Sequence, residues 1–380
     1  MHKLIISTDI GTDIDDALAV YIAARNPSID LKAVWVTNGD VQTRARIARK
    51  LLQYSTRSAP KTRVLLGEPE SLTGEPKPFM HGYEQSFISS KEREQACRWN
   101  IEPDGLHGIK QLMDQETDLK IASIAPMTNL ARLISERPDA QNAIKKVYAM
   151  ACRTGKLEHN IRFDIQAARE VFKSDLSIVI LSGDVCDRYR LQSDDLLCCD
   201  QQGRALEFIN QMAYAWKYRK ERVGLVALVD EVLRNPPCIK EGTDQEKLHA
   251  MYLLEALRQL EIKLDIDSVT NYSFMFRSLV MTNPNFLRYK QQLKKTQISS
   301  FAVHDVYTIF ALLYPSLIQT DKVSVDIDDE GVTSFSKGGR HDLVIDLDYP
   351  AFKEFIYRGL QLTPLKDSQN HTPDLAGQNI

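Results

Sequence analysis

The first two-thirds of this 380-residue chain alternates short apolar runs, rich in β-branched residues, with segments of helical periodicity. Strand–helix–strand repetition is typical of an α/β fold, in which a mostly parallel open sheet has helices on both faces. The predicted strands are Lys3–Ser7, Leu31–Thr37, Val64–Leu66, Leu119–Ile124, one at the end of Ala143–Ala149, and Ser177–Leu181; the predicted helices are Asp15–Arg25, Gln42–Gln53, Thr128–Ser135 and Gln166–Phe172.

The pattern changes in the last part of the chain. Polar–apolar helical segments without strands run from about Asp194 to Arg277, which predicts a helical cap inserted at about residues 194–300. A helix at Phe301–Tyr314 follows, then a late β-hairpin and a closing helix. The hairpin arms are Lys322–Asp328 and Thr333–Asp346, and the helix is Tyr349–Leu360. We therefore predict one domain over residues 1–362 and a polar tail at 363–380.

Charge and hydropathy exclude several classes of protein. The formal net charge is −3, so a broad basic face for nucleic acid is not expected. No apolar stretch reaches the length of about 20 residues that a membrane helix needs, and the amino terminus lacks the pattern of a signal peptide. The six cysteines form no CxxC pair. These features predict a cytoplasmic protein with reduced thiols.

The segment from Ser7 to Ala17 carries four carboxylates within eight residues, at the junction of the first predicted strand and helix. Carboxylates this close repel one another unless a cation lies among them. An all-oxygen set favours a hard ion such as Ca²⁺ or Mg²⁺. Helix capping is the alternative, and it accounts for two of the acids better than for four. The distal Glu of an EF-hand loop is absent.

Polar side chains follow the other predicted strands too. In an open α/β sheet, ligands bind outside the carboxyl ends of the strands. Carboxylates, amides and imidazoles occur there, which suit a metal and sugar hydroxyls, and no motif of a covalent nucleophile is present. The segments concerned are Thr37–Asp40, Ala125–Asn129, Arg153–Asn160 and, before a late helix, Val303–Asp305.

These segments together resemble the inosine–uridine preferring nucleoside hydrolases. STDIGTDIDDALA is similar to the acidic signature of that family, and the other similar segments follow in the family's order. They are NGD at Asn38–Asp40, HGYE at His81–Glu84, IAPMTNLA at Ile124–Ala131, EHNIRFDIQAAREVF at Glu158–Phe172 and VHDVYTIF at Val303–Phe310. The resemblance covers roughly residues 3–362.

The resemblance implies a Ca²⁺-dependent N-ribohydrolase that releases base and ribose from a small-molecule nucleoside, and that is often a homo-oligomer. It implies Asp9 and His304 as catalytic groups, the base for the attacking water and the acid for the leaving nucleobase. It implies the following site residues: Asp9, Asp16, the Thr128 carbonyl and Asp305 for calcium, and Asp15, Asn38, Glu158, Asn160, Asp305 and His81 for the substrate.

The chain departs from the family pattern at four places, and the functional alternatives stay open. Ser7 stands where the family has Asp, Thr12–Ile14 lengthen the acidic loop, Met150-Ala151-Cys152 replaces Met-Gly-Gly, and the family's Asn-x-x-Pro stretch before the Glu158 segment is missing. Asp13 is expected either to cap the helix or to support the site residues from behind, and it could also point into the site. Hydrolysis of another N-riboside, and nucleoside binding without catalysis, are the alternative functions. Stacking on a base is one hypothesis for the cap aromatics Tyr214, Trp216 and Tyr218.

Overall fold

We describe the fold from a computed structural model of the chain. The residues described are 1–55, 61–75, 80, 82–94, 99–197, 203–234, 242–248, 250–251, 276, 280–281, 283–295 and 297–362. His81 and the 363–380 tail lie outside this set. Within it, no helix combines the length and the apolarity that a membrane crossing requires.

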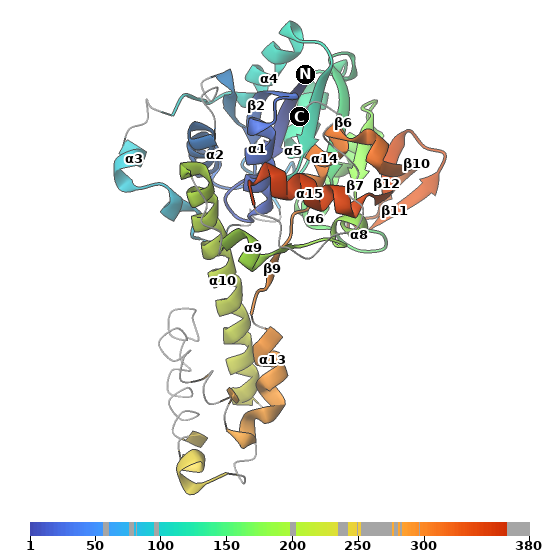
Figure 1. The fold of residues 1–380 in the computed structure, drawn as a ribbon. Coiled ribbons are helices and arrows are strands. Elements are labelled where there is room, and N and C mark those ends of the chain that lie inside the picture. The colour runs from blue at the N-terminus through green and yellow to red at the C-terminus, as the bar shows by residue number, and fades with distance from the viewer. Residues whose placement is uncertain are drawn as a thin grey trace. The chain divides into compact units, whose positions relative to one another are not determined.

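Ten strands form the main sheet, in the order β11-β10-β12-β7-β6-β5-β1-β2-β3-β4 (Figure 1). All neighbouring strands are parallel except that β10 is antiparallel to both β11 and β12. Their bounds are β1 His2–Thr8, β2 Ile29–Val36, β3 Arg63–Leu66, β4 Ile101–Glu102, β5 Leu119–Ser123, β6 Ile144–Met150, β7 Ile178–Leu181, β10 Ile318–Ile327, β11 Thr333–Lys337 and β12 His341–Leu347.

Helices cover both faces of this sheet. The helices α4, α5 and α7 share one apolar core with the sheet, and α1, α2, α14 and α15 pack together over the other face. Their bounds are α1 Asp15–Arg25, α2 Val41–Ser55, α3 Ser90–Glu94, α4 Gly105–Gln115, α5 Thr128–Glu136, α6 His159–Phe163, α7 Ile165–Lys173, α8 Gly183–Cys186, α9 Ser193–Leu197, α14 Val306–Leu313 and α15 Tyr349–Gly359.

The order of the strands places a topological switch beside β1. The chain passes from β1 outward to β2, β3 and β4, and then returns to add β5 on the other side of β1. Crevices that bind ligands form where the strand order reverses in this way, outside the carboxyl ends of the strands. The segments that follow β1 and β5 therefore meet at one place.

The carboxyl-terminal part differs from the sequence prediction in two ways. The second arm of the predicted hairpin splits into β11 and β12, because Gly338 has a φ of 87° and a Cβ on Gly339 would lie 2.1 Å from the Val323 backbone. The predicted helix at Phe301–Tyr314 begins only at Val306. Ser300–Phe301 instead forms β9, which pairs antiparallel with β8 (Leu191–Gln192).

A helix that periodicity did not predict, α4, packs closely against β3. A Cβ on Gly105 would lie 2.0 Å from the Leu66 carbonyl oxygen, and one on Gly108 would lie 2.9 Å from the Leu65 side chain. Glycine lowers helix propensity, yet here it permits the close approach of helix and strand. The two glycines that weaken the sequence signal are thus the residues that the packing requires.

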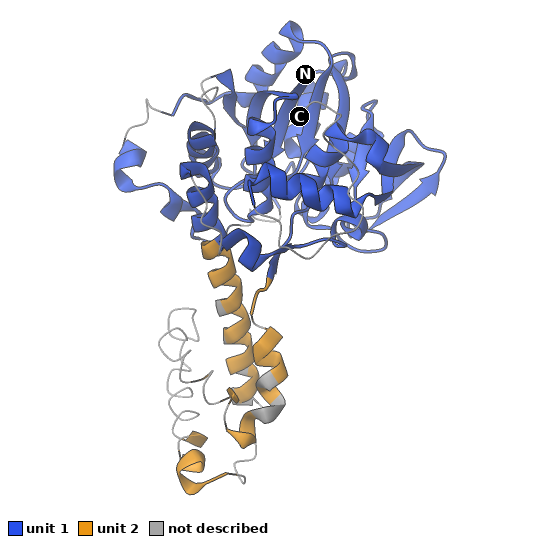
Figure 2. Cartoon of the chain, viewed as in Figure 1, with its two compact units in different colours: residues 1–213, 300–380 blue, residues 214–299 orange. Residues whose placement is uncertain are grey.

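The chain divides into two compact units, residues 1–213 with 300–380, and residues 214–299 (Figure 2). The helix α10 (Arg204–Arg234) continues from the first unit into the second, which also contains η5 (Pro284–Tyr289) and α13 (Lys290–Lys295). The second unit has its own apolar core, with Val229, Val232 and Phe286 fully buried. Trp216 is buried, whereas Tyr214 and Tyr218 are more than half exposed.

Candidate active site

A cavity opens at the carboxyl ends of the central strands. Its lining comes from four parts of the chain: the β1–α1 loop with the start of α1, the residue after β5, the end of β6 with the α6 region, and the residues before α14. The lining residues are Asp9, Thr12, Asp13, Asp15, Asp16, Ile124, Met150, Glu158, His159, Asn160, His304 and Asp305.

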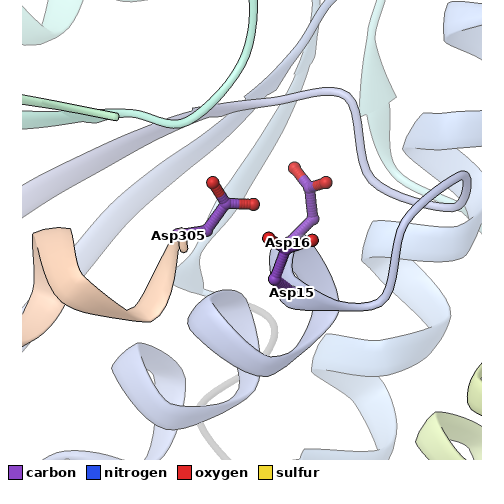
Figure 3. Close-up of side chains that lie close together, drawn as sticks. All are labelled: Asp15, Asp16 and Asp305. Atoms are coloured by element: carbon purple, nitrogen blue, oxygen red, sulfur yellow. The ribbon is translucent and has the colours of Figure 1, made fainter. Parts of the chain in front are cut away.

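Three buried aspartates form the acidic centre of this cavity, which we call the aspartate cluster: Asp15, Asp16 and Asp305. One carboxylate oxygen from each lies within 4.8 Å of the others. Figure 3 shows their carboxylates gathered in one space, two from the start of α1 and one from the residue before α14. Oxygen donors from two distant segments thus form a site of the kind that hard divalent cations occupy.

The carboxyls of the cluster have raised pKa values. Burial is the main cause in each case: it raises the pKa of Asp15 to about 7, with the charge of Asp13 adding to the effect. Burial followed by repulsion from neighbouring aspartates also raises the pKa of Asp16 and of Asp305. A divalent cation would remove this repulsion and restore the ionised forms.

The Asp9 carboxylate is held beside the cluster by Asn38. Its Oδ2 accepts a hydrogen bond of 2.9 Å from Asn38 Nδ2. The residue Asn38 adopts a φ of 70°, and its Oδ1 is buried without a hydrogen-bond partner among the described residues. A buried amide oxygen of this kind is costly unless a ligand donates to it. Asn38 does not itself line the cavity, but it holds the Asp9 carboxylate that does, in a cavity suited to a polar ligand.

A fully buried arginine, Arg44, ties together the two loops that carry these residues. From α2 its Nε donates to the Asn38 carbonyl at 2.5 Å, and its Nη1 donates to the carbonyls of Asp9 and Ile10. Sequence analysis missed this residue. The available signal was its place on the apolar stripe of α2, in line with Ala48 and Leu51, where a surface arginine would not lie.

The opposite wall of the cavity carries Glu158 and Asn160. The Glu158 carboxylate accepts from the backbone N–H groups of Asn160 at 3.0 Å and Ile161 at 3.1 Å. Burial raises the pKa of Glu158, and these two donors oppose the rise. Asn160 Nδ2 donates to the Met150 carbonyl at 3.0 Å. Both side chains are therefore fixed before any ligand enters.

His304 lines the cavity immediately before Asp305. Its Nε2 lies 3.0 Å from Asp187 Oδ1, and Asp187 Oδ2 accepts from Arg153 Nη1 at 2.5 Å. Burial lowers the pKa of His304, and the Asp187 charge opposes this. Burial would raise the pKa of Asp187, but Arg153 and His304 hold it below its usual value. The sequence analysis did not single out Asp187, and it gave Arg153 no role beyond its place at the start of the polar segment Arg153–Asn160.

The lengthened acidic loop is held by the segment after His81. Thr12 Oγ1 donates to Glu84 Oε1 at 3.0 Å, and Tyr83 Oη donates to the Thr12 carbonyl. Asp13, for which a helix cap and a supporting group of the site were the two expectations, lines the cavity, and the residue at the start of α1 has no capping side-chain hydrogen bond. His81, predicted to bind the substrate, lies outside the described residues.

Two further residues from the sequence analysis lie outside the lining. The Thr128 hydroxyl donates to Asp164 Oδ2 at 2.7 Å, which is the carboxylate that caps α7. Ser7 Oγ accepts from Asn129 Nδ2 at 3.4 Å inside the core. The departure from the family pattern at Ser7 therefore concerns core packing. The exposed His159, to which the sequence analysis gave no role, lines the cavity.

Comparison with known proteins decides the family. Residues 4–354 match the sequence profile of the inosine-uridine preferring nucleoside hydrolases. The chain belongs to this family. It is 24% identical to uridine nucleosidase 1 of Arabidopsis thaliana over 61% of this chain and 72% of the relative. It is 25% identical to the non-specific ribonucleoside hydrolase RihC of Escherichia coli (strain SMS-3-5 / SECEC), over 59% of this chain and 75% of the relative.

Solved structures show the same fold. An inosine-guanosine nucleoside hydrolase superimposes with a TM-score of 0.62 at 14% identity, covering 96% of this chain and 100% of that one. An inosine-uridine preferring nucleoside hydrolase from Bacillus anthracis has a TM-score of 0.58 at 15% identity, covering 95% and 99%. Three predictions from the sequence are thereby confirmed at the level of the family: the family itself, the α/β fold, and a hydrolase that acts on N-glycosyl compounds.

Proposed function

We propose that the protein is a calcium-dependent N-ribohydrolase that cleaves the N-glycosidic bond of ribonucleosides. The buried aspartate cluster, at the switch point of a nucleoside hydrolase fold, is the observation that carries the proposal. The relatives named as a uridine nucleosidase and a ribonucleoside hydrolase support the substrate class. Nucleoside salvage, a cytoplasmic location and a homo-oligomer stay predictions from the sequence.

The donor set of the cavity fits a hard cation, because all its candidate ligands are oxygens and three of them are buried carboxylates. Asp16, Asp305 and Asp9, which line the cavity, would hold the ion, and Asp15 lies close enough to join them. The family resemblance adds the Thr128 carbonyl, although Thr128 itself does not line the cavity. When bound, calcium supplies positive charge that anchors vicinal hydroxyls and lowers the pKa of a water at the site.

The residues of the chain then have distinct tasks. Asp9 takes a proton from the water that attacks the anomeric carbon, and the electron pair of the broken C–N bond passes to the base nitrogen. That nitrogen takes a proton from His304. Glu158 and Asn160 hold the ribose hydroxyls, and the nearby carboxylates stabilise the positive charge that develops on the sugar.

Release of free ribose tests the proposal. Reducing sugar should appear when the purified protein is incubated with inosine or uridine, should stop when a chelator removes divalent ions, and should return with added calcium but less with magnesium. Ribose release that is indifferent to chelation would contradict the metal dependence. Tight binding of nucleosides with no ribose release would instead support a binding protein of the same fold.

A further inference from the structure

The start of α1 carries two aspartates of the cluster, Asp15 and Asp16 (Figure 3), yet the residue before it makes no capping side-chain hydrogen bond. A helix start without a capping side chain frays more easily. The loop ahead of it is lengthened by Thr12–Ile14, and Gly11 within this loop has a φ of 113°, which glycine adopts without strain. The position of both carboxylates therefore depends in part on what holds this loop.

Two neighbouring side chains, Tyr83 and Glu84, hold the acidic loop at Thr12, and we call these three residues the loop clamp. Tyr83 Oη donates to the Thr12 carbonyl, and Thr12 Oγ1 donates to Glu84 Oε1 at 3.0 Å. Glu84 Oε2 accepts from the Gly82 N–H at 2.7 Å. The side chain of Glu84 is buried, and a buried carboxylate is costly unless it is hydrogen-bonded. One carboxylate thus joins the acidic loop to the segment after His81.

The segment that provides the loop clamp is itself fixed from its other side. Its short helix η2 (Glu84–Phe87) ends at Phe87, whose buried ring has its centroid 5.8 Å from that of Tyr83 and 6.1 Å from that of Phe208. Lys50 Nζ donates to the Phe87 carbonyl at 2.9 Å. Because Phe208 belongs to the base of α10 and Lys50 to α2, the segment rests on two long helices and can restrain the acidic loop.

We propose that Tyr83 and Glu84 are positioning residues, which hold the start of α1 where Asp15 and Asp16 can bind a divalent cation. Neither Tyr83 nor Glu84 lines the cavity, so both act through Thr12, which does. A loop that is already held loses less conformational freedom when the cation binds, and the affinity is higher for that reason. The inference rests on the proposed function, because the cation is the one proposed for the same cavity.

Calorimetric titration of metal-stripped protein with calcium measures this effect. Tyr83→Phe keeps the ring against Phe87 but removes the donor to the Thr12 carbonyl. It should raise the calcium Kd about twofold to tenfold, the range that the loss of one hydrogen bond spans. Thr12→Val removes the donor to Glu84 and should raise the Kd at least as much, because a buried carboxylate loses a partner. Thr12→Ser keeps the hydroxyl and should restore the parental Kd.

Ser86 provides a matched control in the same short helix. Its side chain is exposed, and its Oγ donates to the Tyr83 carbonyl at 2.5 Å, within the segment itself. Ser86→Ala should leave the calcium Kd unchanged. Saturating calcium should return ribose release by Tyr83→Phe to the parental rate by mass action. A parental Kd in both Tyr83→Phe and Thr12→Val, an equal loss in Ser86→Ala, or a rate that stays low at saturating calcium would overturn the proposal.

Hydrogen exchange of the metal-free protein keeps the inference separate from the proposed function. Amides of residues 10–16 should exchange faster in Tyr83→Phe and Thr12→Val than in the parent and Ser86→Ala, while amides of the central strands keep the parental rate. Equal exchange of the acidic loop in all four proteins, or faster exchange spread evenly over the chain, would contradict the inference. Faster exchange confined to the loop, in a protein that binds no calcium and releases no ribose, would sink only the proposed function.

Discussion

Asp305 joins two segments that are almost three hundred residues apart, since it closes the aspartate cluster that Asp15 and Asp16 begin. We predict that Asp305→Asn keeps the fold and loses both calcium affinity and ribose release. An uncharged amide cannot replace the carboxylate in a paired set, and the remaining acids would still repel one another. Calorimetric titration with calcium and a sugar-release assay measure the two losses, and circular dichroism checks the fold.

Asp348 offers a matched control for this change. It also precedes a helix, and its Oδ1 accepts from the Ala351 N–H at 2.9 Å outside the cavity. Asparagine is as good a cap as aspartate, so Asp348→Asn should keep calcium binding and activity. Parental rates of hydrolysis by Asp305→Asn would show that the assignment of the Val303–Asp305 segment is wrong.

Residues of the site differ in how well the sequence could predict them. Asp9, Asp15, Asp16, Glu158, Asn160, His304 and Asp305 were found, because each lies in a short motif at the end of a strand or the start of a helix. Asp187 was not, since it meets His304 through a contact between distant segments and has no motif of its own. The role of Asp13 stayed open in the sequence, because its local position suits a helix cap as well as a place beside the site.

Among the elements, α2 links the ends of β1 and β2 through Arg44. We predict that Arg44→Met lowers both the free energy of unfolding and the calcium affinity. The three carbonyls that accept from Arg44 would lose their donor, at about 1–3 kcal/mol for each buried acceptor left unpaired. Denaturant unfolding and calcium titration measure the two effects.

The other buried arginine of the same helix separates these effects. Arg49 donates to the carbonyls of Thr62 at 3.0 Å and Asn100 at 2.8 Å and does not line the cavity. Arg49→Met should cost comparable stability but leave calcium affinity unchanged. If both variants lost calcium affinity equally, Arg44 would be a general stabiliser of α2 and not a link between the two site loops.

The predicted elements held best where hydrophobic pattern and local geometry agree. Strands β1, β2, β5 and β7 and helix α1 lie where the apolar runs indicated, because burial on both faces leaves a continuous apolar run. The break between β11 and β12, and the close packing of α4 on β3, depend on glycines whose role appears only when a second segment is adjacent.

For the whole molecule, the raised pKa values of the cluster couple folding to pH. The native carboxyls keep protons that the unfolded chain releases near pH 4, so the native state binds more protons than the unfolded state between about pH 4 and 7. The contribution of the aspartate cluster to the free energy of unfolding therefore falls as pH rises through this range. Calcium, which needs the ionised carboxylates, should therefore raise Tm more at pH 7.5 than at pH 5.

Thermal unfolding of metal-stripped protein, with and without millimolar calcium at the two pH values, measures this difference. Asp305→Asn serves as the control and should show little calcium effect at either pH. A calcium-induced rise in Tm that is larger at pH 5 would be inconsistent with proton release from the cluster.

The short pairing of β8 with β9 has a consequence for the history of the gene. Leu191–Gln192 and Ser300–Phe301 lie side by side, so the segment between them, which includes the whole second unit, starts and ends at one antiparallel pair. A segment whose two ends are held side by side can change in length at little cost in stability, since doubling the length of a loop adds only about 0.6 kcal/mol to the free energy of closing it. Insertions, deletions and exchanges by recombination should therefore accumulate in the part of the gene that encodes the chain between these strands. The parts that encode the chain on either side should keep a constant length.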